Sequence, residues 1–405
     1  MSNLIIVTIL CFLLFSLFPA DAASNPENCI FKSTTVHNLM LCLEKFIIQQ
    51  DQISLKKWKL ELEPTPQEVT AWKSVVRRIL EQNKDNCNDG IVPTAIREIV
   101  IIKRFFDTEQ QSYHCVLTER QLFQNRFANG WGIFIVPIPR KTSQVVLPGL
   151  HLSAAHPFTD GPVQRQTAAL YSKLGAGSMI VTGAVRSSVN ATGECQNHYK
   201  PMDAAHTDKL MFHATLLEVY DWQMSKGCEW NADKNSCLFV QIHGMRNISC
   251  PGVTIFISVG EKEEYGSKFY SDANSAVNRL SASLKQLLPS DWLILTAERT
   301  EKCNLAATTN VFGRIINGVP QSDACKQRAA QTGVTGQFLH IEQDKTTNSQ
   351  LPETYDSWVE AFRRIFGIST TSSGGSTRSV ESGLGTCLFL VLSSIILNIL
   401  VHVDK

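Results

Sequence analysis

The sequence predicts an α/β protein with a mostly parallel open sheet flanked by helices, preceded by a helical region that bears disulfides. Two observations lead to this fold class. From about residue 145, short apolar runs alternate with stretches of helical periodicity, which is typical of βα units in a parallel sheet. Before that point, apolar residues recur mainly at helical spacing, and four cysteines lie among them.

The first 22 residues are expected to be a cleaved signal peptide. The run from Leu4 to Phe18 has no charged residue and is short for a membrane span, and Ala20-Asp21-Ala22 matches a signal-peptidase site. An uncleaved anchor helix is the alternative. The chain is therefore expected to enter the secretory pathway.

Residues 23–140 are predicted to form a helical N-terminal region. Thr65-Pro66-Gln67-Glu68 combines an N-cap, a first-turn proline and a capping-box glutamate. Apolar residues then follow at helical spacing, at Val69, Trp72, Val76 and Ile79.

Residues 141–368 are predicted to form the α/β domain. The expected strands are 145–154, 178–185, 237–242, 253–259, 292–297 and 336–341. Between them, helices are expected at 163–174, 203–225 and 271–288. A closing helix carries Tyr355, Trp358, Phe362 and Phe366 on one face.

The C-terminal end matches a glycolipid-anchor signal. A Ser/Thr/Gly-rich linker at 369–385 precedes an apolar tail at 386–405, with only Asp404 and Lys405 after the apolar run. This order is typical of a GPI signal whose tail is removed, and Ser373 is the expected attachment residue. A tail-spanning helix is the alternative. The sequence therefore predicts attachment to the outer leaflet of the plasma membrane.

Cysteine and charge usage agree with an extracellular protein. Of twelve cysteines, Cys11 and Cys387 lie in the expected removed ends, so ten remain and allow five disulfides. Asn190 and Asn247 begin glycosylation sequons. The chain has 38 Lys and Arg against 37 Asp and Glu, which argues against nucleic acid as its main partner.

Polar residues follow several of the predicted strands, where sites form in open α/β sheets. His156 and Asp160 follow the first strand, Arg186 the second, His243 the third and Glu342 the last. Two imidazoles and one carboxylate, with water in a fourth position, are typical of catalytic zinc. We therefore interpret His156, Asp160 and His243 as metal ligands and Zn²⁺ as the expected cofactor.

Catalytic and substrate-binding roles are assigned around that cluster. Glu342 is the candidate general base, and Arg186 is the second candidate catalytic residue. Arg186 or Arg314 is expected to bind a carboxylate of the substrate. The further candidates for substrate binding are Asn310, Arg314, Asn317 and His206. Each residue also has an ordinary structural interpretation: a hydrogen-bonded histidine, a helix cap for Asp160, or a salt bridge for Glu342.

Taken together, these motifs resemble the zinc-dependent exopeptidase-like amidohydrolases over about residues 145–366. Ala155-His156-Pro157 with Asp160 resembles their first metal motif, and His243-Gly244 resembles their later ligand. The segment 310–318 and Ile341-Glu342 are similar to their substrate-binding segment and catalytic strand. The resemblance is to poly-γ-glutamate hydrolases, N-formylglutamate amidohydrolases and zinc carboxypeptidases, and it implies a phosphorylase/hydrolase-like fold with one zinc ion.

One departure from that pattern bears on the ligands. The carboxypeptidases space their first ligands H-x-x-E, whereas His156 and Asp160 are one residue further apart. The expectation is a GPI-anchored zinc hydrolase of amide bonds, acting on a small molecule or peptide with a free carboxylate. The alternatives are a disulfide-rich surface protein that binds without catalysis, and a metal-dependent esterase or deacetylase.

Overall fold

The computed structural model describes residues 25–81, 84–138, 147–228, 230–231, 234–235, 237–298 and 303–368. They belong to one unit, which ends at Ile368. The expected signal peptide at 1–22, Ser373 in the linker and the apolar tail at 386–405 lie outside these ranges. No helix within them combines the length and apolarity that a membrane crossing requires.

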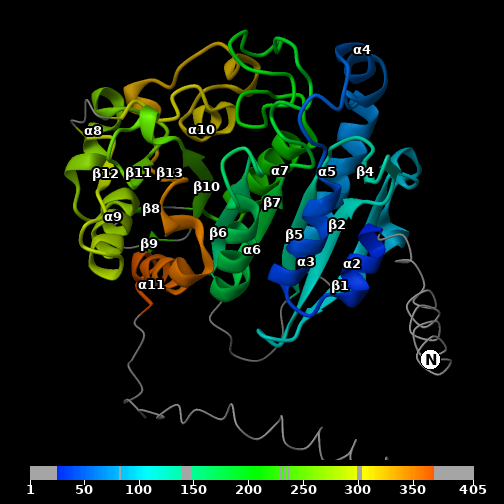
Figure 1. The fold of residues 1–405 in the computed structure, drawn as a ribbon, viewed down its shortest axis with the longest axis horizontal. Helices are drawn as coiled ribbons and strands as arrows, with labels where there is room; N and C mark the ends of the chain where they lie inside the picture. Colours follow the sequence, from blue (N-terminus) through cyan, green and yellow to red (C-terminus); the bar gives the residue numbers. More distant parts are fainter. Residues whose placement is uncertain are drawn as a thin grey trace, which may run out of the picture. The chain divides into compact units, whose positions relative to one another are not determined.

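A mixed nine-stranded sheet runs through the unit, in the order β1-β2-β5-β7-β6-β10-β13-β11-β12 (Figure 1). Its four central strands, β7, β6, β10 and β13, are mutually parallel. The strands toward β1 are antiparallel, and β11 pairs antiparallel with β13 and parallel with β12. The predicted α/β class with flanking helices is therefore confirmed, and the predicted parallel strands form the centre of a mixed sheet.

The sheet strands are β1 (Val100–Asp107), β2 (Ser112–Glu119), β5 (Ile133–Ile138), β6 (Leu147–Ala154), β7 (Ala176–Val181), β10 (Leu238–Met245), β11 (Ile255–Ser258), β12 (Ile294–Thr296) and β13 (Phe338–Asp344). Two small hairpins pair β3 (Leu122–Phe123) with β4 (Arg126–Phe127) and β8 (Trp230–Asn231) with β9 (Lys234–Asn235). The helices are α2 (Pro26–Lys32), α3 (Val36–Leu43), α4 (Leu55–Lys57), the π-helix η2 (Trp58–Leu62), α5 (Pro66–Leu80), α6 (Val163–Leu174), α7 (Met211–Ser225), α8 (Glu263–Ser271), α9 (Ala276–Leu287), α10 (Val311–Ile316) and α11 (Tyr355–Ile365). The 3-10 turns are η1 (Glu44–Phe46), η3 (Lys84–Asn86), η4 (Asp89–Ile91), η5 (Thr94–Ile96), η6 (Asn247–Ser249), η7 (Gln321–Asp323), η8 (Gln331–Gly333), η9 (Asn348–Gln350) and η10 (Pro352–Thr354).

Helices cover both faces of the parallel centre. The chain moves from β6 through α6 to β7, and then returns past β6 through α7 to β10. Because such crossovers are right-handed, opposite directions of travel place α6 and α7 on opposite faces. Because helices cover the sheet on both faces here, every residue of β10 is buried, and β10 begins as an unbroken apolar run.

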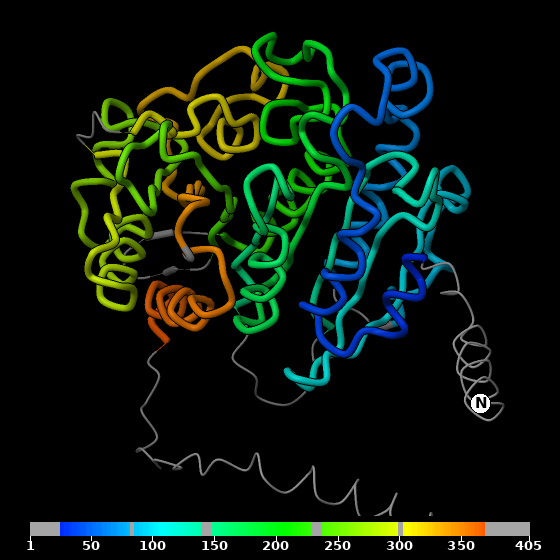
Figure 2. The backbone as a smooth tube through the Cα atoms, viewed as in Figure 1, coloured from blue at the N-terminus to red at the C-terminus, as the bar shows by residue number. Residues whose placement is uncertain are grey.

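The N-terminal region is helical only in its first half, which corrects the prediction for 23–140. The capping box of α5 is present as predicted, with Thr65 and Glu68 exchanging hydrogen bonds. Beyond it, β1, β2 and β5 extend the sheet of the following residues, so position 140 separates no independent domain. In Figure 2 this blue-to-cyan part of the chain occupies one end of the sheet, opposite residues 255–296.

A short N-terminal segment also braces the loop that follows β7. Ile48 donates to the carbonyl of Gly183 at 2.9 Å, and Val185 donates back to Ile48 at 2.9 Å. Further along, Ile53 donates to the carbonyl of Ser188 at 3.0 Å. The N-terminal region therefore holds the loop that carries Arg186.

All ten cysteines between the chain ends are paired, which confirms the five predicted disulfides. The bonds are Cys29–Cys42, Cys87–Cys115, Cys195–Cys325, Cys228–Cys237 and Cys250–Cys303. Cys250–Cys303 and Cys195–Cys325 fix the two ends of the segment 303–325, which includes α10.

Buried neutral histidines away from the cluster should make the fold acid-labile. His151 contacts Gln223 Oε1 at 3.0 Å and Ser178 Oγ at 2.8 Å, and burial lowers its pKa from 6.5 to about 4. As pH falls, the unfolded chain therefore binds the extra proton before the folded chain does. The contribution of neutral His151 to the free energy of unfolding is complete above pH 6.5 and is lost as pH falls toward 4. At about 1.4 kcal/mol per pH unit, protonation of His151 should lower the free energy of unfolding by roughly 2 kcal/mol at pH 5 compared with neutral pH.

Urea unfolding at pH 7 and pH 5 tests this expectation. His151→Gln should shrink the difference in unfolding free energy between the two pH values, because it removes the titrating ring. An unchanged difference in this variant would show that His151 does not contribute to the acid lability.

Candidate functional site

Two neighbouring strands present polar side chains at their carboxyl ends. In the parallel pairing of β10 with β13, His243 lies opposite Glu342 and Gln241 lies opposite His340. Because side chains alternate along a strand, Gln241 and His243 share one face, as do His340 and Glu342. All four are buried.

The loop after β6 brings two more groups to the same place. His156 follows the strand, and Asp160 donates its backbone N–H to the carbonyl of His156 at 3.0 Å. Gly244 permits the close approach of this loop to β10, because a Cβ there would stand 1.9 Å from the carbonyl oxygen of Asp160. Phe158, in the middle of the loop, has a left-handed backbone with φ of 60°, which is costly for a bulky residue.

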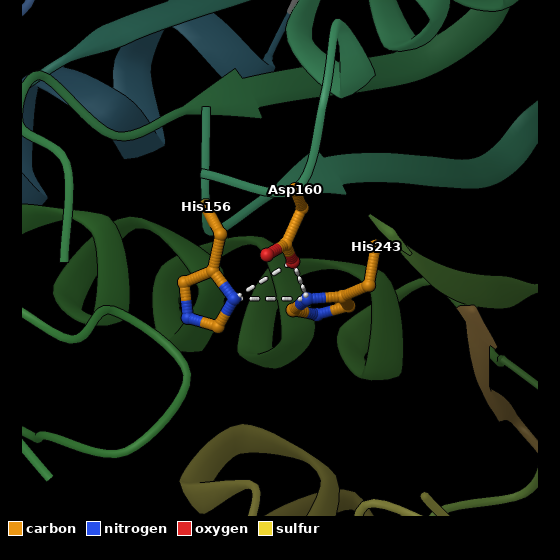
Figure 3. Close-up of side chains that lie close together, drawn as sticks. All are labelled: His156, Asp160 and His243. Carbon is orange, nitrogen blue, oxygen red and sulfur yellow. Dashed lines mark hydrogen bonds and ion pairs between the residues drawn. The ribbon is translucent and has the colours of Figure 1, made fainter. Parts of the chain in front are cut away.

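His156, Asp160 and His243 meet through three atoms (Figure 3). Asp160 Oδ2 lies 3.0 Å from His156 Nδ1 and 2.9 Å from His243 Nδ1. The two ring nitrogens are 3.1 Å apart. The structure thus brings together the three residues that the sequence predicts as metal ligands.

The opposite nitrogen of each ring fixes its tautomer. His156 Nε2 lies 2.8 Å from Asp203 Oδ1, and His243 Nε2 lies 2.8 Å from Gln241 Oε1. Carboxylate and amide oxygens accept only, so each Nε2 carries the hydrogen. Asn310 Nδ2 also donates to Gln241 Oε1, at 2.5 Å, which confirms the orientation of that amide.

It follows that three hydrogen-bond acceptor atoms converge, and that none of them needs to carry a hydrogen. With both rings neutral, each Nδ1 is an acceptor, and so is Asp160 Oδ2. Such a triangle requires a positive charge at its centre, supplied by a proton or by a metal ion. The pairing of each ring with an oxygen on its far side is typical of metal-ligating histidines. These residues therefore fit a metal ion.

Two further groups of possible ligands occur among the described residues. His243, His340 and Glu342 form one, but it shares His243 with the triangle. Cys195, Asp208 and Cys325 form the other, but both of its sulfurs are consumed in a disulfide. The triangle is the group in which every ligand atom is free and oriented.

The surrounding charges favour a cation at this position. Burial lowers the pKa of His156, but the carboxylates of Asp203 and Asp160 outweigh burial and raise it to about 9. Burial raises the pKa of Asp160, but its two histidine neighbours hold it well below the usual value. Burial lowers the pKa of His243.

A cavity of about 280 Å³ opens onto the triangle. Glu342 lines it, and Glu342 Oε2 has no hydrogen-bond partner among the described residues. Burial, together with nearby Asp160, raises the pKa of this carboxyl to about 8. Three cationic side chains also line the cavity: Arg186, Arg246 and Lys345. Negative charge entering the cavity would therefore meet positive charge.

The remaining predicted residues divide into two groups. Asn310 and His206 line the cavity. Arg314 and Asn317 do not: Arg314 donates to the carbonyls of Thr308 and Ala324, and Asn317 donates to that of Val259. These two side chains hold the wall of the cavity by backbone contacts, so the structure gives them no direct approach to a ligand.

Three site residues had no assigned role at the level of sequence. Asp203 and Gln241 orient the histidine rings, and His340 lines the cavity beside Glu342. The spacing of two residues from Gln241 to His243 and from His340 to Glu342 was the available signal, because it places both members on one face of a strand. The contact of Asp203 with His156 spans 47 residues, and no local pattern indicates it.

Comparisons with known proteins add little to this picture. No family profile matches the chain, and no curated protein matches it. Among solved structures, the chain is similar to gene product Atu2144 from Agrobacterium tumefaciens, with 13% identity and a TM-score of 0.29. That match covers 54% of this chain and 87% of the other.

Proposed function

We propose that this chain is a zinc-dependent hydrolase that cuts an amide bond close to a free carboxylate of a small molecule or peptide. The observation that carries the proposal is the triangle of His156 Nδ1, His243 Nδ1 and Asp160 Oδ2, whose lone pairs point at one another over 2.9–3.1 Å. Two nitrogens and one oxygen from the protein, open to a cavity, match the ligands of catalytic zinc sites.

The dimensions support zinc as the ion. Ligand atoms at about 2.0–2.2 Å from one tetrahedral zinc ion lie roughly 3.3–3.6 Å apart, so the triangle would widen by only a few tenths of an ångström to hold the ion. When bound, zinc supplies Lewis-acid chemistry: it polarises a carbonyl and makes water acidic near neutral pH. The cavity provides the open side that such chemistry requires.

Glu342 is the proposed general base. In its ionised form this buried group borders the cavity with one oxygen unpartnered among the described residues, so it can accept a proton from water. The water oxygen then forms a bond to the amide carbon, and the C–N bond breaks. The proton held on Glu342 passes to the departing nitrogen, which leaves as an amine.

Arg186 and the cations near it are proposed to hold the substrate carboxylate. Arg186 Nη2 lies 3.3 Å from Asp160 Oδ1, and its loop is braced by the N-terminal segment described above. Within the described part of the chain, Arg246 has no ion-pair partner, and the Lys345 ammonium donates only to the carbonyl of Thr159. A guanidinium can grip a carboxylate with two hydrogen bonds, which would fix the amide relative to Glu342.

The finer fold assignment and the location are part of the same proposal. The order of His156, Asp160, His243 and Glu342 along the chain is similar to that in zinc exopeptidase-like amidohydrolases, which favours a phosphorylase/hydrolase-like sheet. Five disulfides are typical of an oxidising compartment. We therefore propose secretion and anchoring by GPI at the outer leaflet of the plasma membrane.

Zinc should bind the purified protein one to one and stabilise it. Because the triangle is assembled only in the folded chain, ligand binding adds to the unfolding free energy, by about 2.7 kcal/mol at a free zinc concentration 100 times Kd. Elemental analysis after dialysis and thermal unfolding with and without zinc measure both effects. A protein that takes up no zinc and shows no shift would instead support a binding protein without catalysis.

A further inference from the structure

We infer that Asn247 carries an N-linked oligosaccharide at the mouth of the catalytic cavity, and that this sugar restricts the size of the molecules that reach the site. The inference rests on two features of the turn that follows β10: its sequon and its place on the rim. Its occupancy depends on passage through the secretory pathway. Its effect on substrates rests on the proposed function.

The sequon forms part of the cavity rim. Met245 and Arg246 line the cavity, and so does Ser249, the hydroxyl residue of the sequon. Asn247 and Ile248 between them are exposed, with 85% of Ile248 accessible to solvent. A group attached to Asn247 is therefore adjacent in sequence to Arg246 and two residues from Ser249, both of which line the cavity.

The atom that would be modified is available. Asn247 Oδ1 accepts a hydrogen bond from the backbone of Gly252 at 2.8 Å, which orients the amide. Asn247 Nδ2, the nitrogen that bears the sugar in an N-glycan, makes no hydrogen bond to the described residues. The side chain is thus held by its oxygen while its nitrogen remains free to carry a sugar.

The turn that carries Asn247 is held in place, so the attachment point of the sugar stays at the cavity rim. Residues 247–249 form the 3-10 turn η6, and Cys250 donates to the carbonyl of Asn247 at 3.2 Å. Cys250 is bonded to Cys303, whose neighbour Asn304 lines the cavity. The residue that follows the sequon is therefore linked by a disulfide to a second segment of the cavity wall.

An oligosaccharide at Asn247 would be large compared with the cavity. An N-glycan is bulky and strongly hydrated, and its branched chain of sugar rings exceeds a cavity of about 280 Å³. A small molecule or the end of a flexible peptide can pass beside it, whereas the surface of a folded protein cannot. The accessible substrates are therefore small or unfolded.

The second sequon offers a matched control. Asn190 is also exposed, and its Oδ1 accepts from Lys200 Nζ at 2.8 Å, but Asn190 does not line the cavity. Removing a sugar at Asn190 changes glycan mass and charge in the same way as removal at Asn247. It leaves the rim unchanged.

Occupancy is tested on the full chain produced in a secretory host. Trypsin releases the two sequons on separate peptides, one starting at Asn247 and one starting at Ser187. Enzymatic release of N-glycans in ¹⁸O-water converts each occupied Asn to labelled Asp, which mass spectrometry detects. Absence of label at Asn247 would overturn the inference, whatever the fate of the proposed hydrolase activity.

Access is tested without metal or catalysis, by acylation of Lys345 inside the cavity. A small succinimidyl ester and the same ester carried on a compact, globular dendrimer of several kilodaltons are compared, with exposed Lys32 as the internal reference. Because the sugar acts on the association step, Asn247→Gln should let the large ester react about tenfold faster, within the spread typical of such steps. The small ester should react equally in both proteins.

Two further variants separate the sugar from the side chain. Ser249→Ala removes the sequon but keeps the hydrogen bond from Gly252 to Asn247, and should match Asn247→Gln. Ser249→Thr keeps the sequon and should match the wild type, as should Asn190→Gln. If Asn190→Gln opens the cavity equally, or if Ser249→Ala leaves the large ester excluded, the rim position of the sugar does not control access.

Discussion

Glu342→Gln should lower the rate of amide hydrolysis by about 10²- to 10⁴-fold, the usual contribution of a general base. The amide has the shape of the carboxylate but cannot accept the proton from water. Glu342 Oε2 has no partner among the described residues, so the change breaks no hydrogen bond there. The rate is measured on whichever N-acyl amino acid the wild type hydrolyses, and the zinc content is measured in the same sample.

A second buried carboxylate provides the control. Glu119 is fully buried and accepts backbone hydrogen bonds from Asn129 and Trp131, at 2.8 and 2.5 Å. Glu119→Gln should lower stability while leaving the rate per folded molecule unchanged. Full activity in Glu342→Gln, or loss of zinc from it, would show that Glu342 is not the base.

His243→Ala should weaken zinc binding by more than about 10²-fold, because the change removes a ligand, and even groups that only orient a ligand contribute 10- to 100-fold. Asp160 and His156 remain, but two ligands hold an ion far less firmly than three. The dissociation constant follows from competition with a chromogenic chelator. Hydrolysis should be lost in parallel.

A similar histidine on the neighbouring strand β6 serves as the control. His151 is equally buried and meets a glutamine oxygen through Nε2, as His243 does, but it lies outside the triangle. His151→Ala should destabilise the fold and leave zinc affinity unchanged. Asp203→Asn weakens only the hydrogen bond on the far side of the His156 ring. It should lower zinc affinity by about 10- to 100-fold, between the effects of His151→Ala and His243→Ala. Unaltered zinc binding in His243→Ala would refute the ligand assignment.

The sequence predicted the second half of the fold well because its strands and helices alternate. Helix α6 has the predicted bounds of 163–174, and β6, β7, β10 and β13 lie within a few residues of the predicted strands. The carboxyl ends of parallel strands meet at one edge, so His156, Asp160 and His243 could be grouped from their positions alone. That grouping agrees with the structure.

The first half was predicted less well for a physical reason. β1 contains an apolar run, Val100 to Ile102, that is buried on both sides, and such a run shows neither the period of a helix nor that of a strand. The antiparallel pairing of β5 with β7, which joins this half of the sheet to the parallel centre, brings together residues that are far apart in the chain. Sequence periodicity carries no information about that pairing.

The predicted substrate-binding residues were also only partly predictable from the sequence. Asn310 caps α10 and Arg314 lies within it, yet the first lines the cavity and the second donates to the backbone carbonyls of Thr308 and Ala324. A four-residue spacing within one short helix cannot reveal which side chain faces a ligand. That choice is made by the loops packed around α10.

The disulfides at both ends of the segment 303–325 separate two stages of maturation. Cys250–Cys303 and Cys195–Cys325 close loops with sequence separations of 53 and 130 residues. In a reducing environment the stretch that supplies Asn310 has no disulfide at either end. Under the proposed function, oxidation would therefore fix the part of the cavity wall that Asn310 supplies, and the reduced chain would hold that part less firmly.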